Sequence, residues 1–145
     1  MIIYTIGFAK KSAEEFFGTL KRAGIKRLID IRLNNTSQLA GFSKRQDLPF
    51  FLKEILGADY VYKPELSPTQ EMIDDWKKNK GAWEHFEGKF IPLIAERKIE
   101  KELDKKLFQV PAVLLCSEPE PTHCHRRLVA EYLKSHWKGV EIVHL

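Results

Sequence analysis

Hydrophobic and polar residues follow two different periods along this chain. Short β-branched runs such as "IIYTI" at residues 2–6 have the composition of strands. The segment that follows carries apolar residues at helical spacing, among them Phe16, Phe17 and Leu20. Strands and helices then alternate along the rest of the chain. This alternation predicts a three-layer α/β/α domain with a mainly parallel, Rossmann-like sheet.

Local signals set the expected limits of these elements. Ser12 followed by Glu15 is a capping-box pattern at the start of the first helix. Pro92 is expected to kink or restart the helix that contains it. The polar segment 33–47 shows neither period, and a loop of that length in a small domain is usually functional or mobile. The expected strands are 2–6, 27–32, 60–63, 112–116 and 140–145, and the expected helices are 12–24, 48–57, two or more within 69–107, and 122–137.

Length and composition indicate one globular domain that covers residues 1–145. Hydrophobic residues make up 43% of the chain and charged residues 30%, a balance that excludes a disordered protein. No apolar run reaches the roughly 18 residues of a membrane span, and the amino-terminal segment lacks the layout of a signal peptide. We therefore expect a cytoplasmic protein with no membrane partner. The net charge of +4 permits a nucleic acid or an anionic small molecule as a partner, but a solvated basic surface explains it equally well.

The chemically reactive side chains gather in one segment, "VLLCSEPEPTHCHRR" at residues 113–127. It contains both cysteines of the chain, Cys116 and Cys124, and two of its five histidines. Because no export signal is present, thiol chemistry or metal binding is favoured over a structural disulfide. Thiolate and imidazole ligands suit zinc or iron, so Cys116, Cys124 and His125 form a candidate metal site. Their spacing is not that of a standard zinc finger.

The expected strands bring further polar residues to the same edge of the sheet. In parallel sheets, ligands bind beyond the carboxyl ends of the strands. The strand ends predicted here carry Gly7, Asp30 with Arg32, and Cys116 with Glu118. A glycine at such a position would let a ligand approach the backbone. Asp30 is a candidate base, or a group that orients a histidine.

The helix after the second cysteine is expected to begin at this edge as well. Thr122 is its expected N-cap, which places the positive end of the helix dipole beside the cysteines. That dipole lowers the pKa of a nearby thiol, so Cys124 is expected to be partly thiolate at neutral pH. At about 100° per residue, His125 points toward the sheet rim, Cys124 and Arg126 flank it, and His123 points away.

Three stretches of the chain together resemble the family of domain of unknown function 488. They are "YTIGF" at residues 4–8, "LIDIR" at 28–32 and "LLCSEPEPTHCHRRLVAEYL" at 114–133. Family members often carry His-Ser where this chain has Phe8 and Ala9. The resemblance implies the α/β architecture and the positions of the motifs, and it names no reaction. The matching positions are Tyr4–Gly7, Asp30, Arg32, Cys116, Glu118 and Cys124–Arg126.

A looser similarity links the chain to rhodanese-like domains. They share an Asp-x-Arg strand and a cysteine between a parallel strand and a helix. Their short loop between Cys and Arg is absent here, because Arg126 lies ten residues beyond Cys116. Sulfur or phosphoryl transfer is therefore only an analogy.

Functions of different classes remain open on the sequence. The leading hypothesis is an enzyme with an anion-binding pocket at the sheet rim, acting on a phosphate- or carboxylate-bearing substrate. The alternative is a metal- or nucleic-acid-binding module without turnover, for which the basic pair Lys44 and Arg45 is the best sequence support. A scaffold with unreactive thiols is a third option. In the enzyme, Cys124 or Cys116 is the reactive thiol and His125 is its base. Either Glu118 or Asp30 supplies the remaining acid–base function. The residues expected to bind substrate are Arg32, Arg126, Gly7 and Ser37.

Overall fold

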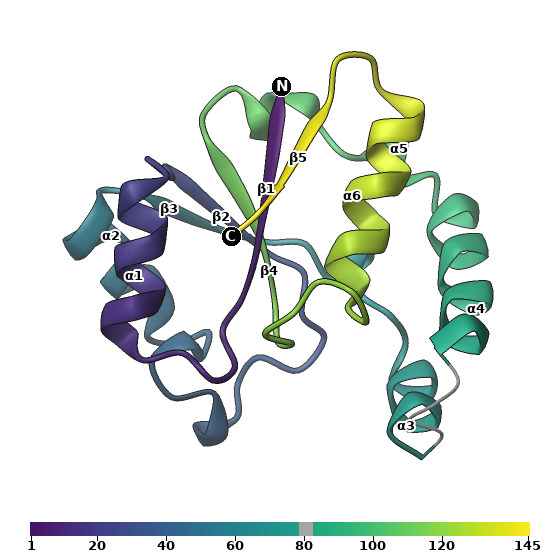
Figure 1. The fold of residues 1–145 in the computed structure, drawn as a ribbon, viewed down its shortest axis with the longest axis horizontal. Helices are drawn as coiled ribbons and strands as arrows, with labels where there is room; N and C mark the ends of the chain where they lie inside the picture. Colours follow the sequence, from purple (N-terminus) through teal and green to yellow (C-terminus); the bar gives the residue numbers. More distant parts are fainter. Residues whose placement is uncertain (79–82) are drawn as a thin grey trace.

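The strands form one sheet in the computed structural model, which describes residues 1–78 and 83–145. Five strands of the described chain lie parallel, in the order β3-β2-β4-β1-β5 (Figure 1). The predicted α/β fold with a parallel sheet is therefore confirmed. The strands are β1 (Ile2–Gly7), β2 (Arg27–Asp30), β3 (Asp59–Tyr62), β4 (Ala112–Cys116) and β5 (Glu141–His144).

Helices cover both faces of the sheet, as the predicted three layers require (Figure 1). Two helices, α1 and α2, contribute to the apolar core on one face, and α4, α5 and α6 contribute to the core on the other. Short 3₁₀ turns at Gln38–Ser43, Pro64–Leu66 and Lys105–Phe108 connect the larger elements. The helices are α1 (Ala13–Arg22), α2 (Leu48–Leu56), α3 (Gln70–Lys78), α4 (Trp83–Glu96), α5 (Ile99–Glu102) and α6 (His125–His136).

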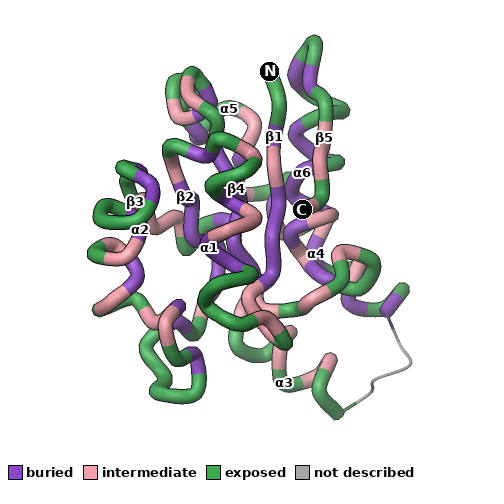
Figure 2. Tube along the Cα trace, turned by 60° about the vertical axis from the view of Figure 1, so that its left-hand side comes forward, coloured by how far each residue is buried: buried purple, intermediate pink, exposed green. Residues whose placement is uncertain are grey.

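The central strand β4 is buried along its whole length (Figure 2). It pairs with β1 on one side and with β2 on the other. Its side chains alternate between the two cores, so Val113 lies with Phe16 of α1, whereas Leu114 lies with Phe90 of α4. Each fully buried Leu, Ile or Phe contributes about 1.5–3 kcal/mol. This packing holds β4 firmly and fixes the point from which Cys116 emerges.

Local signals set two helix ends, and the first of them is the predicted cap at Ser12. Ser12 caps α1, where its hydroxyl accepts a hydrogen bond from the Glu15 backbone N–H at 3.1 Å. Gly57 follows α2 with a φ of 62°, a left-handed conformation that is natural for glycine after a helix. The start of α1 and the end of α2 are therefore each fixed by a residue at that end of the helix.

Other expectations about the helices are corrected. The N-cap prediction at Thr122 is wrong, because α6 begins at His125 with Cys124 as its N-cap. A turn precedes it, in which the Cys124 N–H donates to the Pro121 carbonyl at 3.2 Å. Helix α4 continues through Pro92, so the helix does not restart there. The segment 33–47 also contains the 3₁₀ turn at Gln38–Ser43.

The carboxyl ends of the central strands lie side by side, as expected from the parallel arrangement. Gly7 at the end of β1 is opposite Cys116 of β4, and Asp30 at the end of β2 is opposite Leu115. The residues predicted at three strand ends therefore share one rim. Among the described residues, no helix has the length and apolar character needed to cross a bilayer.

Candidate functional site

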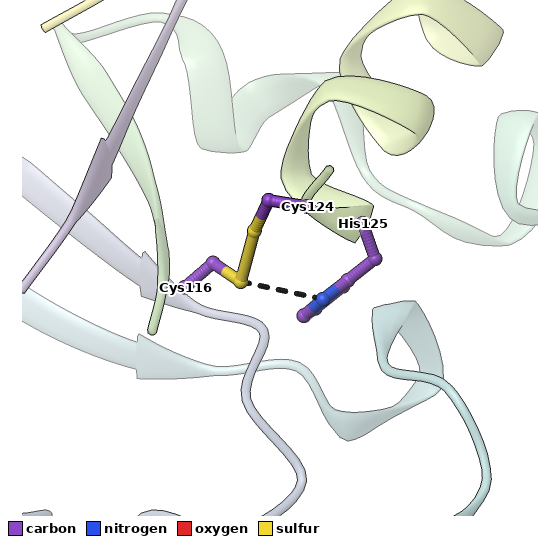
Figure 3. A group of neighbouring side chains, drawn as sticks. All are labelled: Cys116, Cys124 and His125. Atoms are coloured by element: carbon purple, nitrogen blue, oxygen red, sulfur yellow. Dashed lines mark hydrogen bonds between the residues drawn. A yellow bond between two sulfur atoms is a disulfide. The ribbon is translucent and has the colours of Figure 1, made fainter. Parts of the chain in front are cut away.

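The two cysteines meet at this rim. Cys116 is the last residue of β4 and Cys124 is the N-cap of α6, and both are buried. Their sulfur atoms are bonded as a disulfide, with Cα atoms 7.4 Å apart (Figure 3). The sequence favours free thiols or a metal over a bridge, whereas this structure holds the bridged form. The predicted proximity of the two sulfurs is confirmed.

His125 lies beside Cys116, and a dashed line joins the two side chains in Figure 3. Its Nε2 lies 2.8 Å from the Ile31 carbonyl, and its Nδ1 lies 3.3 Å from Cys116 Sγ. A carbonyl can only accept, so Nε2 carries the hydrogen. Burial lowers the pKa of His125 to about 4, which keeps the ring neutral near pH 7. Nδ1 therefore directs a lone pair at the sulfur of Cys116, and the predicted direction of His125 is confirmed.

Arg126 clamps the loop that connects the cysteines. Its side chain is buried and donates to Thr5 Oγ1 at 3.2 Å, to the Pro119 carbonyl at 3.3 Å and to the Glu118 carbonyl. Burial lowers the pKa of Arg126 to about 10, so the guanidinium stays charged at neutral pH. These internal partners indicate a positioning residue that holds the loop against β1.

Gly7 takes part in the same clamp. A Cβ atom on Gly7 would overlap the Glu118 carbonyl and crowd the Arg126 guanidinium. The sequence predicts that this glycine lets a ligand approach the backbone of β1. In the structure, the backbone of the loop after β4 takes that place.

Asp30 and Arg32 form a buried ion pair at the end of β2. The Arg32 guanidinium donates to both Asp30 carboxylate oxygens at 2.9 Å and to the Ser43 carbonyl at 2.7 Å. Tyr60 and Asn35 also donate to Asp30, at 2.5 and 3.0 Å. Although burial raises the pKa of Asp30, the hydrogen bonds and charge of Arg32 outweigh it and the net shift is downward. The pair anchors the 33–47 loop to the sheet.

A cavity of about 650 Å³ opens beside the disulfide. It is lined by five of the residues singled out from the sequence: Arg32, Cys116, Glu118, Cys124 and His125. The other four singled-out residues, Asp30, Arg126, Gly7 and Ser37, are not among its lining residues. The cavity is thus lined by both cysteines and by His125, whereas Asp30, Arg126 and Gly7 lie behind its lining.

A family model described as "Domain of unknown function DUF488" matches residues 12–133. The chain belongs to this family. The match includes the Asp30–Arg32 pair and the whole cysteine segment, whereas β1 and β5 lie outside it. No curated protein and no solved structure matches this DUF488 chain.

Two groups of weaker candidates in the DUF488 chain lie away from the cysteines. Ser37 is exposed and caps the 3₁₀ turn, where its hydroxyl accepts from the Leu39 N–H at 3.1 Å. Lys44 pairs with Asp47 at 3.2 Å, and the Arg45 guanidinium lies over the Tyr62 ring. Lys44 and Arg45 therefore both have partners within the chain.

The cavity of this DUF488 chain also has an aromatic wall that the sequence motifs do not reveal. We use that term for Trp76, Trp83, Phe86 and His123, all of which line the cavity. Trp83 and Phe86 have the spacing of the buried face of a helix. The sequence pattern predicts that Trp76 and Trp83 are core or lid residues. His123 is exposed but stacks on Trp83, although the helical projection directs it away. Only the helix-to-helix packing reveals the wall.

Proposed function

We propose that this protein is a thiol-dependent enzyme in which Cys116 is the nucleophile and His125 is its base. The observation that carries the proposal is the direction of the His125 lone pair. Nδ1 faces Cys116 Sγ at 3.3 Å, while the Nε2 hydrogen is held by the Ile31 carbonyl. A base oriented by a third group beside a nucleophile is the usual arrangement in covalent catalysis.

The reaction begins from the reduced protein. A dithiol reductant gives two electrons and two protons to the Cys116–Cys124 bond, which yields two thiols and an oxidised reductant. Because the pKa of His125 is lowered, Nδ1 accepts the proton of Cys116 in the same step in which the sulfur attacks an electrophilic atom of the substrate. The leaving group departs with the electrons of its bond and takes the proton from the imidazolium. We therefore assign the enzyme to a reducing compartment such as the cytoplasm.

We propose that the substrate carries a phosphate or carboxylate group. Three positive features border the cavity: Arg32, Lys77 and the amino end of α6 at His125. The guanidinium of Arg32 has internal partners, so Lys77 and the helix end are the main candidates for anion binding. Glu118 also lines the cavity and is the remaining candidate for acid–base work.

Alkylation of the reduced protein by iodoacetamide tests the nucleophile. We expect native Cys116 to react faster than Cys124, as measured by mass spectrometry of the separated peptides. His125→Asn should slow the reaction of Cys116 at neutral pH by about 100-fold or more, within the range usual for loss of a general base. His136→Asn, at the far end of α6, is the matched control and should leave the alkylation rate of Cys116 unchanged. Equal rates in wild type and His125→Asn would reject the proposal.

A metal centre is the second candidate function, and the ligand geometry favours it specifically. Cys116, Cys124 and His125 each offer an atom, and these atoms lie within 4.8 Å of one another. A histidine that ligates a metal through one nitrogen normally donates its other N–H to a carbonyl or carboxylate, as His125 does to Ile31. Two thiolates and one imidazole would bind zinc or iron and leave a fourth position for a ligand from the cavity.

Elemental mass spectrometry of untagged protein, purified under reducing conditions, separates the two candidates. About one zinc or iron per chain, lost in Cys124→Ser, would favour the metal centre. Metal far below one per chain, together with fast alkylation of Cys116, would favour the thiol enzyme.

A further inference from the structure

The sulfur of Cys124 has no part in the attack proposed for Cys116. His125 directs its Nδ1 at Cys116 Sγ, at 3.3 Å, which assigns the base to that sulfur. Cys124 Sγ nevertheless lies within bonding distance of Cys116 Sγ, and both cysteines line the cavity (Figure 3). Any group that Cys116 binds covalently is therefore within reach of a second thiol.

The two sulfurs are held together by contacts that do not involve sulfur. The Phe8 N–H donates to the Cys116 carbonyl at 3.3 Å, and the Cys124 N–H donates to the Pro121 carbonyl at 3.2 Å. The buried Arg126 guanidinium binds two carbonyls of the loop between the cysteines and the side chain of β1 residue Thr5. The end of β4 and the start of α6 therefore keep their places when the disulfide is reduced.

Cys124 is free to react as a thiolate. It is the N-cap of α6, but its side chain makes no capping hydrogen bond. Ser, Thr, Asp and Asn are the residues preferred for capping, so capping does not account for a cysteine here. The free N–H groups and the dipole at the amino end of the helix stabilise the negative charge of a thiolate. Cys124 can therefore attack without a base of its own.

We propose that Cys124 is the resolving thiol of the enzyme, so that each turnover reduces the substrate by two electrons. A disulfide between the cysteines forms only when two electrons leave the sulfurs, and the bridge in this structure is that oxidised state. The resolving role rests on Cys116 being the nucleophile proposed above.

The substrate class that fits this cavity is a small-molecule disulfide with carboxylate groups. A cavity of about 650 Å³ is many times the roughly 30 Å³ that a water-sized oxidant such as hydrogen peroxide occupies, and it lies in the usual range for small-molecule sites. Lys77 and the amino end of α6 border it and supply the contacts for the carboxylates.

The reaction balances in two exchanges. The sulfur of Cys116 attacks one sulfur of the substrate while its proton passes to His125 Nδ1, and the first half of the substrate leaves with the electrons of the S–S bond and takes up that proton. Cys124 then attacks Cys116 Sγ, and the second half leaves as a thiol with the proton of Cys124. The substrate is reduced to two thiols, the cysteines are oxidised to the bridge, and a dithiol reductant restores them.

Reaction of the reduced protein with one equivalent of dithiobis(nitrobenzoic acid), an aromatic disulfide with two carboxylates, tests the resolving role. We expect wild type to release both coloured thiols of the probe and to retain no adduct by intact mass spectrometry. Cys124→Ser should lose the second release and keep one half of the probe on Cys116. Cys124→Ala is the second variant if the serine protein does not fold.

Ser135→Ala, at the far end of α6, is the matched control and should release both thiols as wild type does. Wild type that retains the adduct would overturn the resolving role. An adduct trapped on Cys124 in Cys116→Ser, formed as fast as the one on Cys116, would overturn it as well, because the two thiols would then be equivalent.

The substrate class is tested by comparing cystine with its dimethyl ester, which lacks the carboxylates. Each rate of oxidation of the folded protein is divided by the rate for the protein unfolded in urea. We expect this ratio to be about tenfold or more higher for cystine. Lys77→Met should remove most of the preference, whereas Lys78→Met, at a position outside the cavity lining, should keep it. Equal ratios, or faster oxidation by hydrogen peroxide than by cystine, would overturn the class.

The resolving role and the proposed nucleophile fail independently. Fast, His125-dependent alkylation of Cys116 together with a retained adduct in wild type would reject only the resolving role. Release of both thiols at a rate that His125→Asn leaves unchanged would keep the exchange between the cysteines and reject His125 as the base.

Discussion

At Gly7 the missing side chain lets the end of β1 meet the loop that follows β4. Gly7→Ala places a methyl group where the Glu118 carbonyl lies. Overpacking of this kind typically costs about 1–3 kcal/mol, and the atom that the methyl group meets belongs to backbone rather than to a flexible side chain. We expect a lower free energy of unfolding in urea and a displaced cysteine loop.

The matched control for that substitution is Gly88→Ala in α4. Gly88 is exposed, and a Cβ there meets no described atom within 4 Å. Alanine should raise the free energy of unfolding by about 0.5–1 kcal/mol, because glycine is a poor helix former. A Gly7→Ala protein as stable as wild type would contradict the close packing inferred at the rim.

The carboxylate of Asp30 supports a prediction about pH. Tyr60 donates to it at 2.5 Å, and this bond helps to lower the pKa of Asp30. Tyr60→Phe should therefore cost about 1.5–3 kcal/mol at neutral pH, as for a hydrogen bond to a charged group. The contribution of a carboxyl group with a lowered pKa is present above its unfolded pKa and is lost as the pH falls through the folded pKa.

Urea denaturation of both proteins from neutral pH down to about pH 3 checks this dependence. The stability gap between wild type and Tyr60→Phe should narrow in acid as Asp30 becomes protonated. Tyr62→Phe, on the same strand, keeps the ring that lies under Arg45 and serves as the comparison. A gap that stays constant with pH would show that Tyr60 acts through packing alone.

At the scale of elements, the Cys116–Cys124 bond ties the end of β4 to the start of α6. The cysteines are separated by 8 positions, and closing a loop of that size is worth about 2–3 kcal/mol in the chain-entropy account. Reduction should lower the free energy of unfolding by that amount. Urea curves with and without reductant measure it, and a Cys116→Ser, Cys124→Ser double variant should not respond to the reductant. Identical wild-type curves would mean that the bridge does not form in solution.

Helix α4 carries a proline in its interior. Pro92 cannot donate the helical hydrogen bond of its position, and its ring crowds the preceding turn. Pro92→Ala should raise the free energy of unfolding by about 1–2 kcal/mol, since part of the gain is offset by a more flexible unfolded chain. Thermal unfolding followed by circular dichroism measures the change. A lower midpoint would indicate that α4 requires a bend at this position.

At the scale of the whole molecule, the local patterns of the sequence are sufficient to predict the fold. Strand β4 is apolar at every position because both of its faces are buried, and that run stands out in the amino-acid sequence alone. The capping of α1 by Ser12 involves residues only three positions apart, so it is predictable too. The placement of the two cysteines together follows from one rule about parallel sheets.

Features that depend on distant partners are not predictable in this way. Asp30 and Arg32 are recognisable as a pair, but the hydrogen bond that Tyr60 donates to Asp30 from β3 is not. Helical periodicity marks Trp83 as a core residue, but its stacking on His123 depends on how the turn before α6 packs against α4. The N-cap lies at Cys124 rather than at Thr122 because the preceding turn closes on Pro121.

The order of the strands also has a consequence for the time course of synthesis. β1 pairs with β4 and β5, whose residues are made more than a hundred positions later. β2 can pair early with β3, but it is joined to β1 only through β4. The first strand therefore leaves the ribosome long before its neighbours exist, and long-range pairing of this kind is slow. A nascent chain stalled before Ala112 would expose the edges of β1 and β2 to other chains or to chaperones.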